Sequence, residues 1–323
     1  MTSILEVRDL RVAYDTASGP AEAVSHVSLD VAPGEFLAIV GESGCGKSTL
    51  LFAIAQLLTY PARLTGGSIL FDGVDFTTLD PETLRQSRWR DISLVMQSAM
   101  NALNPTLTIG AQLADVCRAH TDWDDRRIEQ RCAEVLTMVS IDPVHLRSYP
   151  FQLSGGMRQR AMIAMALLLE PKLVIMDEPT SALDVVAQRS LMSQVEELRR
   201  RLGFAVLFVT HDMSVVSHFS DRLAVMYAGE VVELGATREV FDHPRHPYAR
   251  GLMDAFPSLI GERRPLTGIA GNPPSLVDPP RGCLFAPRCA HATDHCRTAR
   301  PALVEADGHA VRCFLVNDEE DRV

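Results

Sequence analysis

The residues with the clearest chemical potential form one glycine-rich segment, Gly41-Glu42-Ser43-Gly44-Cys45-Gly46-Lys47-Ser48-Thr49. It fits the pattern G-x-x-x-x-G-K-[ST], in which glycines let consecutive backbone N–H groups curl around a phosphate. Lys47 can reach the β- and γ-phosphates of a nucleotide, and the hydroxyl of Ser48 can ligate Mg²⁺. We therefore expect a nucleotide site formed by Gly41, Ser43, Gly44, Cys45, Gly46, Lys47, Ser48 and Thr49.

The segments on either side decide whether this pattern is more than a glycine-rich turn with a chance lysine. Residues 36–40 are a continuous apolar run, as expected of a strand buried on both faces. Residues 48–54 begin a helical pattern. A strand, a glycine loop and a helix in this order place the helix N-terminus and its dipole against the phosphate. This context favours the nucleotide site over the chance turn.

Composition narrows the class of protein. The chain has 323 residues and a formal net charge of −10, which argues against a general nucleic-acid binder with a basic footprint. No apolar run is long enough to span a bilayer, since Glu170 and Lys172 interrupt the best candidate. Charged residues among the first nine exclude a signal peptide. We expect a cytosolic protein.

Hydrophobic periodicity predicts the elements that would position the loop. Strands are expected at residues 5–12, 24–31, 66–71, 173–176 and 205–209, a largely helical stretch at 81–147, and helices at 154–169 and 188–202. Ser154 is expected to cap the first of these helices, and Gly203 to end the second. Apolar strands that alternate with helices predict an α/β core with a mostly parallel sheet.

Further motifs appear in a fixed order along residues 5–235, and together they resemble the ATP-binding cassette (ABC) ATPases. They are Gln97 (Q-loop), Leu153-Ser154-Gly155-Gly156-Met157-Arg158-Gln159-Arg160 (signature), Asp177-Glu178 (Walker B), Ser181-Ala182-Leu183-Asp184 (D-loop) and His211 (switch histidine). Each motif alone is weak, but the ordered set is specific. The resemblance implies a P-loop ABC ATPase core with an antiparallel β part, a helical subdomain at about 81–165 and a small cysteine-rich extension.

The resemblance also implies roles at the nucleotide. Mg²⁺ requires hard oxygen ligands, which Ser48, Gln97 and Asp177 (through water) can supply beside the phosphates. Glu178 would act as the general base toward the attacking water. His211 would contact the γ-phosphate and orient that water, so the catalytic set is Glu178, His211 and Gln97.

Two further implications concern adenine and a second chain. Tyr14 matches the aromatic residue that stacks on adenine, although an ordinary β-sheet tyrosine remains an alternative. In this family the signature of one subunit covers the γ-phosphate bound by the other. The resemblance therefore implies a head-to-tail dimer with a homologous ATPase, in which the partner's ATP would be contacted by Ser154, Gly155, Gly156 and Asp184.

The region after residue 235 has its own pattern. The run His246-Pro247-Tyr248-Ala249-Arg250-Gly251-Leu252 and the later Gly271-Asn272-Pro273-Pro274 resemble the segment that follows the ATPase domain in dipeptide, oligopeptide and nickel importers. Four cysteines follow with the spacing C-x5-C-x6-C-x16-C: Cys283, Cys289, Cys296 and Cys313. This spacing is loose for zinc, and four thiolates suit a [4Fe–4S] cluster, which members of this family carry here. Zinc and free buried thiols remain alternatives.

These observations predict an ATPase subunit of an ABC importer for short peptides. It would comprise a nucleotide-binding domain (1–235) and a linker with a cysteine-rich module (236–323). We expect it to lie peripherally on the cytoplasmic face of the membrane, with two permease subunits and, indirectly, an extracytoplasmic solute-binding protein. Nickel or another small solute is the alternative cargo. A soluble ABC ATPase that acts on the ribosome or on nucleic acid is the remote alternative.

Overall fold

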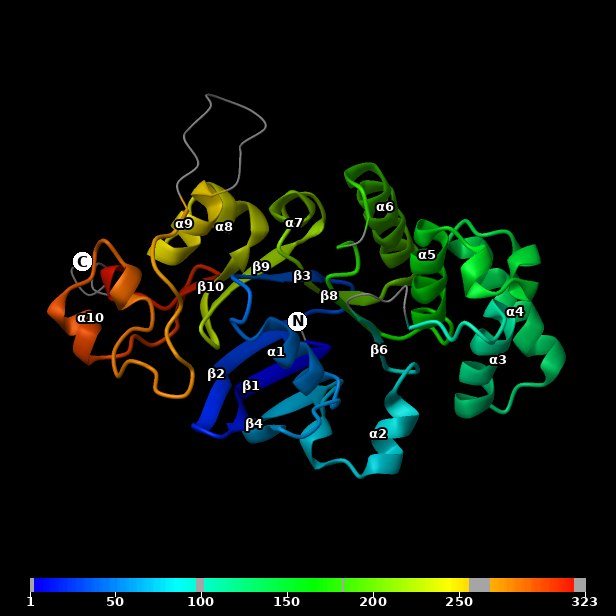
Figure 1. The fold of residues 1–323 in the computed structure, drawn as a ribbon, viewed down its shortest axis with the longest axis horizontal. Coiled ribbons are helices and arrows are strands. Elements are labelled where there is room, and N and C mark those ends of the chain that lie inside the picture. Colours follow the sequence, from blue (N-terminus) through cyan, green and yellow to red (C-terminus); the bar gives the residue numbers. More distant parts are fainter. Residues whose placement is uncertain (1–2, 97–101, 182, 256–267, 317–323) are drawn as a thin grey trace. The chain divides into compact units, whose positions relative to one another are not determined.

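The computed structural model describes residues 3–96, 102–181, 183–255 and 268–316 (Figure 1). These residues fall into two compact units that interleave along the chain. The first unit contains residues 1–5, 31–36 and 70–208, and the second contains residues 6–30, 37–69 and 209–323.

Most of the second unit is built on two sheets. Three long strands form one of them in the order β2-β1-β4: β1 (Leu5–Thr16), β2 (Gly19–Val31) and β4 (Ala62–Phe71). The other has the order β11-β12-β10-β9-β3: β3 (Phe36–Val40), β9 (Arg222–Tyr227), β10 (Glu230–Ala236), β11 (Val304–Ala306) and β12 (His309–Val311). β3 and β9 are parallel, whereas the pairs that involve β10, β11 and β12 are antiparallel. The predicted parallel core with an antiparallel part is confirmed.

Short helices complete the second unit: α1 (Lys47–Ile54), α7 (Met213–Phe219), α8 (Thr237–Asp242), α9 (Pro247–Asp254), the 3-10 turn η5 (Ala286–Arg288) and α10 (Asp294–Thr298). Its core joins β3 and β9 to the C-terminal segment. Tyr227, Tyr248 and Phe285 lie in this core with their rings 4.6 to 5.5 Å apart. The residues that follow the predicted ATPase domain therefore share a hydrophobic core with its central strands.

The first unit combines parallel strands with a group of helices. β8 (Ala205–Val209), β7 (Leu173–Asp177) and β6 (Ile92–Val95) are neighbours in this order, and β6 and β7 are parallel. β5 (Val74–Asp75) pairs with the end of β4. The helical elements are η1 (Phe76–Thr78), α2 (Pro81–Ser87), α3 (Ile109–His120), α4 (Asp125–Met138), η3 (Pro143–Arg147), η4 (Pro150–Gln152), α5 (Gly155–Ala166) and α6 (Val185–Leu202). Helices α3, α4 and α5 pack on one another (Figure 1).

The sequence pattern was wrong in one element of this unit. The stretch 81–147 was predicted to be largely helical, but Ile92–Val95 is the strand β6, which pairs with β7. Four residues are too few to show a period, and only the pairing with β7 reveals the strand.

Both predicted helix ends are confirmed, although the helix bounds differ slightly from the prediction. The Ser154 side chain accepts a hydrogen bond from the N–H of Met157 and so caps α5, which ends at Ala166 instead of 169. Gly203 ends α6 with a φ of 77°, a conformation that favours glycine, and α6 starts at Val185 instead of 188. Among the described residues, no helix is long and apolar enough to cross a membrane.

Candidate functional site

The phosphate-loop segment follows the buried strand β3 and leads into α1. Gly41 and Gly46 have φ values of 154° and 103°, which L side chains rarely adopt. A Cβ on Gly41 would lie 2.2 Å from the carbonyl oxygen of Met226, and one on Gly46 would lie 2.1 Å from that of Ala23. Only glycine fits at these two positions, so neighbouring backbone fixes the path of the loop.

Lys47 lies inside this loop and is 7% exposed. Its Nζ donates hydrogen bonds to the carbonyl oxygens of Gly41, at 2.9 Å, and Glu42, at 3.0 Å. The sulfur of Cys45 lies 3.7 Å from the same Nζ, and burial raises the pKa of the Cys45 thiol. The arrangement holds a positive charge at the centre of the loop. Burial outweighs the effect of Lys47 on the Cys45 thiol and favours its protonated form, which is a poor nucleophile.

Tyr14 lies beside the helix that begins at this loop. It is half-buried on β1, and its Oη is 3.1 Å from Oγ1 of Thr49, so either hydroxyl can donate. The structure thus brings the predicted adenine-stacking residue next to α1, although the two residues are 35 positions apart.

His211 follows the end of β8 and is exposed. Its neighbour Thr210 donates a backbone hydrogen bond to the carbonyl of Ile39, at 3.4 Å. Ile39 lies two residues before Gly41, near the end of β3. His211 therefore follows its strand at the same edge at which the phosphate loop follows β3. Ligands of open α/β sheets bind at the carboxyl edge of the strands.

The first unit holds the predicted acidic pair. Asp177 is the last residue of β7 and is 3% exposed. Glu178 follows with a φ of 45°, in the left-handed region that is strained for a non-glycine residue. Because backbone strain of this kind is kept mostly at functional sites, the turn after β7 is a candidate site in its own right.

Two helix N-termini in the first unit carry the signature and D-loop residues. Ser154 is exposed at the start of α5, and Gly155 and Gly156 form its first turn. Asp184 caps α6 by accepting a hydrogen bond from the N–H of Ala187, at 2.8 Å. Both helix ends therefore point polar groups toward solvent, where a second molecule can reach them. Gln97 and Ala182 lie outside the described residues.

Large apolar side chains are exposed next to both of these helix ends. Phe151, 71% exposed, stacks on Tyr149 with ring centroids 5.6 Å apart, just before Ser154. Val185 and Val186, directly after Asp184, are 78% and 80% exposed. Exposed apolar groups beside polar motifs are typical of a surface that a partner covers.

The four C-terminal cysteines line one small pocket in the second unit, together with His246, Pro247, Phe285, Ala286, His291, Pro301, Phe314 and Leu315. Burial raises the pKa of the Cys283 and Cys289 thiols, and that of Cys313 to about 11. The structure thus gathers thiols that are up to 30 residues apart in sequence (Cys283 and Cys313). Among the described residues, no three His, Cys, Asp or Glu side chains are placed to hold a single metal ion.

The run that begins at His246 is held by a buried carboxylate. Glu233 on β10 is fully buried and accepts hydrogen bonds from the N–H groups of Arg245 and His246, both at 2.8 Å. His309 Nε2 lies 2.7 Å from Oε1 of Glu233. His246 caps α9 through its Nδ1, which accepts from the N–H of Tyr248 at 3.0 Å, and burial lowers the pKa of His246 to about 3. A neutral His246 is therefore part of the fold at physiological pH.

Two residues near the phosphate loop were missed by sequence reasoning. Arg288 forms an ion pair with Glu42, and the hydroxyl of Tyr248 accepts a hydrogen bond from the N–H of Glu42. These partners are 246 and 206 positions apart in sequence, and no local pattern connects them.

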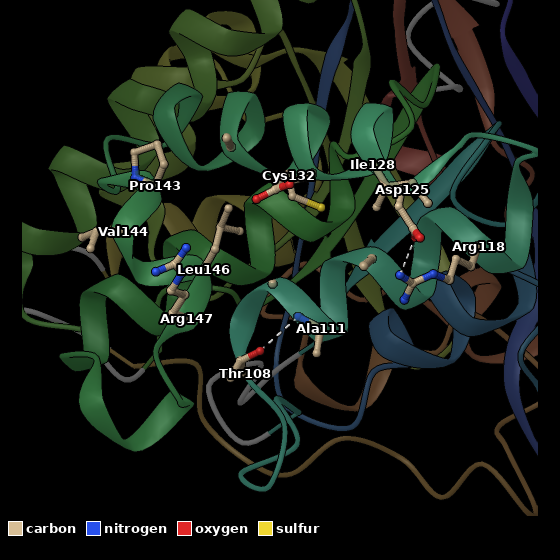
Figure 2. Close-up of a pocket in the computed structure, with 14 residues that line it drawn as sticks. Thr108, Ala111, Arg118, Asp125, Ile128, Cys132, Pro143, Val144, Leu146 and Arg147 are labelled. Carbon is tan, nitrogen blue, oxygen red and sulfur yellow. Dashed lines mark hydrogen bonds and ion pairs between the residues drawn. The ribbon is translucent and has the colours of Figure 1, made fainter.

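A separate pocket in the first unit lies among α3, α4 and η3 (Figure 2). Figure 2 shows the ion pair of Arg118 and Asp125 toward one end and Val144 and Arg147 toward the other. The residues that line it include none of those predicted to bind nucleotide.

Two family models match the chain. The model described as "ABC transporter" matches residues 24–181, and "Oligopeptide/dipeptide transporter, C-terminal region" matches residues 232–296. The dipeptide transport ATP-binding protein DppD of Bacillus subtilis is 43% identical over 98% of this chain and 95% of its own length. DppD of Caldanaerobacter subterraneus is 41% identical over 98% of both chains. The oligopeptide transport ATP-binding protein OppD of Escherichia coli is 41% identical over 98% of this chain and 94% of its own length.

Solved structures agree with this result. The ATP-binding cassette MJ0796, solved as a dimer in a post-hydrolysis state bound to ADP and phosphate, is 30% identical. It matches with a TM-score of 0.65 over 72% of this chain and 99% of its own. CbiO1 of Clostridium perfringens, part of the ABC transporter complex cbiONQ, is 29% identical and has a TM-score of 0.65 over 75% of this chain and 92% of its own.

Proposed function

The chain belongs to the ABC transporter family of ATP-binding proteins, and we propose that it is the ATP-hydrolysing subunit of an importer of short peptides. The main support for the ATPase activity is the phosphate loop with the buried Lys47 at its centre. The peptide cargo is supported by relatives that transport dipeptides and oligopeptides and match over nearly the whole chain. It is also supported by the match of residues 232–296 to the C-terminal region of such transporters.

ATP would bind with its phosphates in the loop. N–H groups of residues 41–49 would surround the β-phosphate, while the ammonium of Lys47 would leave the loop carbonyls to contact the β- and γ-phosphates. Tyr14, hydrogen-bonded to Thr49 beside α1, would stack on adenine.

Mg²⁺ and the attacking water would be held by polar side chains from several of the motifs. The hydroxyl of Ser48, the carboxylate of Asp177 and the amide oxygen of Gln97 are hard oxygen donors of the kind that Mg²⁺ prefers. When bound, the ion would neutralise the charge that develops on the phosphates. Glu178 would accept a proton from the water, and His211 would orient that water toward the γ-phosphate.

A second ATPase chain would complete the site. Gly155 and Gly156 in the first turn of α5 are half-exposed, and Ser154 and Asp184 are exposed. The exposed Val185 and Val186 add apolar area next to Asp184, as a partner interface would require. We propose a head-to-tail pair of homologous ATPase subunits, in which Ser154, Gly155, Gly156 and Asp184 contact the ATP of the partner.

Closure of this pair would drive transport through two integral-membrane permeases, which receive cargo from an extracytoplasmic solute-binding protein. The chain would lie on the cytoplasmic face of the membrane as a peripheral subunit. The test is uptake by the reconstituted complex of this chain with its permeases and binding protein. Uptake of labelled di- or oligopeptides that requires ATP supports the proposal, whereas transport of nickel without peptide transport overturns the peptide cargo.

Substitution of the base tests the proposed chemistry in the same complex. Glu178→Gln should keep ATP binding, trap the closed dimer and abolish turnover. The matched control is Glu197→Gln, which changes an exposed carboxylate of α6 and should leave turnover unchanged. Undiminished ATP hydrolysis by Glu178→Gln would remove Glu178 from the role of base.

We further propose that the cysteine pocket holds a [4Fe–4S] cluster. Four thiols with apolar neighbours line one pocket, and each thiolate of such a cluster binds a different iron, so the four sulfurs need not meet around one ion. When bound, the cluster would cross-link the segment 283–296 to Cys313.

Anaerobic purification followed by analysis of iron, acid-labile sulfide and zinc tests the cluster. Cys313→Ser should lose iron, and Cys132→Ser, which changes a buried cysteine outside the pocket, should keep it. A wild-type chain without iron and sulfide, or with zinc in their place, would refute the cluster.

A further inference from the structure

Glu42 brings a negative charge into the loop that must receive the phosphates of ATP. It follows Gly41 directly and is the first variable residue of the motif. Its side chain is 27% exposed, so solvent screens the carboxylate only in part. A bound nucleoside triphosphate carries several negative charges, and an uncompensated carboxylate in the loop would repel it.

Arg288, which belongs to the C-terminal segment, neutralises the negative charge of Glu42. Its Nη1 lies 2.7 Å from Oε2 of Glu42 and its Nη2 lies 2.9 Å from Oε1, which is a bidentate pair. The Arg288 side chain is 4% exposed, and an arginine guanidinium stays protonated in proteins. The guanidinium is therefore charged, buried and aimed at one carboxylate of the phosphate loop.

The backbone around Arg288 holds this guanidinium in place. Arg288 donates hydrogen bonds to the carbonyl oxygens of Ala270, at 2.9 Å, and Ile269, at 3.1 Å. Its Nη1 also lies 3.4 Å from the hydroxyl of Tyr227 in the core. With these contacts the side chain has few other conformations, so it acts as a fixed cation next to the loop.

Tyr248 holds the backbone of Glu42. Its hydroxyl accepts a hydrogen bond from the N–H of Glu42 at 2.9 Å, and its ring is fully buried among Tyr227 and Phe285. Side chain and backbone of Glu42 are thus both held by residues that follow the predicted ATPase domain.

We propose that Arg288 and Tyr248 are positioning residues for the ATPase reaction, which set the charge and the shape of the phosphate loop through Glu42. The proposal rests on ATP binding by this loop, as given under the proposed function. Neither residue touches the nucleotide in this scheme. Arg288 directly precedes Cys289, so the cysteine pocket and the phosphate loop share one short segment of chain.

A double-variant cycle separates this role from simple support of the fold. If Arg288 serves to neutralise Glu42, removal of both charges should be less harmful to ATP binding than removal of Arg288 alone. If Arg288 only holds the C-terminal segment, Glu42→Gln should give no rescue. The variants are Arg288→Met, Glu42→Gln and their combination, with Arg297→Met, an exposed arginine of α10, as matched control.

The measurement is the Kd of the purified full-length chain for Mg-ATP and Mg-ADP, with iron content and Tm recorded for each variant. Arg288→Met should raise the Kd for ATP about tenfold, and by less for ADP, which carries less charge. The double variant should return to within about threefold of the wild type. Arg297→Met should match the wild type in every readout.

Three outcomes would overturn the inference. They are an unchanged Kd in Arg288→Met, a double variant as weak as Arg288→Met, and equal effects on ATP and ADP. Lys47→Ala distinguishes failure of the inference from failure of the proposed function. If the wild type binds ATP and Lys47→Ala does not, the site is real and only the role of Arg288 falls. If neither binds, the proposed function itself is wrong.

Tyr248→Phe tests the second contact with a change of one hydroxyl. It leaves the N–H of Glu42 without its acceptor, so the Kd for ATP should rise about threefold while the buried ring stays in the core. Tyr60→Phe, which removes an exposed hydroxyl, is the control. An unchanged Kd in Tyr248→Phe would leave Arg288 as the single positioning residue and refute the role of Tyr248.

Discussion

Helices α1 and α5 both present a first turn of backbone N–H groups, but their surroundings differ. The start of α1 is buried, Gly46 caps it without a side-chain hydrogen bond, and Lys47 fills the loop in front of it. The start of α5 is half-exposed, and Ser154 caps it. The start of α1 combines backbone donors with a lysine and so suits a bound phosphate. The start of α5 offers its donors at the surface, where a nucleotide held by another chain could reach them. This difference supports the proposed head-to-tail pair, in which α5 of one chain would contact the ATP bound by the other.

The largest expected effect follows from Lys47, the cation buried in the loop in front of α1. Lys47→Ala should lower the affinity of the full-length chain for Mg-ATP by about 100-fold, because the charge that opposes the phosphates is lost. Equilibrium titration with ATP measures this. Arg160→Ala, a change at a half-exposed position of α5, should leave the affinity of the isolated chain for ATP unchanged, and an equal loss of affinity in both variants would contradict the difference between the two helix ends.

A substitution at the start of α5 should affect dimerisation and turnover, which require two chains, and not ATP binding by one chain. Ser154→Arg places a bulky cation at the exposed start of α5. The Kd of the isolated chain for ATP should stay within about twofold, while ATP-dependent dimerisation and turnover should be lost. Size-exclusion chromatography in the Glu178→Gln background reports the dimer. Normal dimerisation and hydrolysis by Ser154→Arg would contradict a partner-facing α5.

Alanine in place of Gly46 or Gly156, the glycines at these two helix ends, should change the free energy of unfolding in opposite directions. Gly46→Ala forces a Cβ to within 2.1 Å of the carbonyl oxygen of Ala23 at a φ of 103°. We expect a loss of roughly 2–4 kcal/mol in the free energy of unfolding, because the left-handed conformation and the backbone clash both cost energy. Urea unfolding measures it, and a loss below about 1 kcal/mol would show that the loop can move aside.

The smallest expected effect has the opposite sign. A Cβ on Gly156 would meet nothing within 4 Å, and alanine favours the helix over glycine. Gly156→Ala should therefore raise the free energy of unfolding by about 0.5–1 kcal/mol. The same variant should slow hydrolysis in the assembled complex, where we propose that Gly156 faces the partner's ATP. A variant that is more stable and fully active would remove Gly156 from the interface.

Sequence patterns were sufficient where neighbours along the chain decide the structure. The buried runs of β3, β7 and β8 are continuous apolar stretches, and the caps at Ser154 and Gly203 follow from local hydrogen bonding and φ. The strand β6 was missed because its pairing partner lies about 80 residues later in the chain. Local periodicity carries no information about such a partner.

The candidate site divides in the same way. The glycines of the phosphate loop could be identified from the motif alone, and their φ values and close contacts give the physical reason for them. The positions of Tyr14 beside Thr49 and of Thr210 beside Ile39 required the fold. The roles of Gln97, Glu178, His211 and Asp184 stay predictions, which the substitutions above can test.

By itself, the sequence determined the chemistry of this protein: a phosphate loop, an acidic pair after a buried strand and a signature helix, each formed by residues that are adjacent in the chain. The tertiary structure alone decided which distant groups act on that chemistry. It placed Arg288 and Tyr248 on Glu42 and gathered four cysteines around one pocket. The reason is physical: a loop's shape follows from local φ and hydrogen bonds, whereas an ion pair between distant residues forms only when packing brings both partners together.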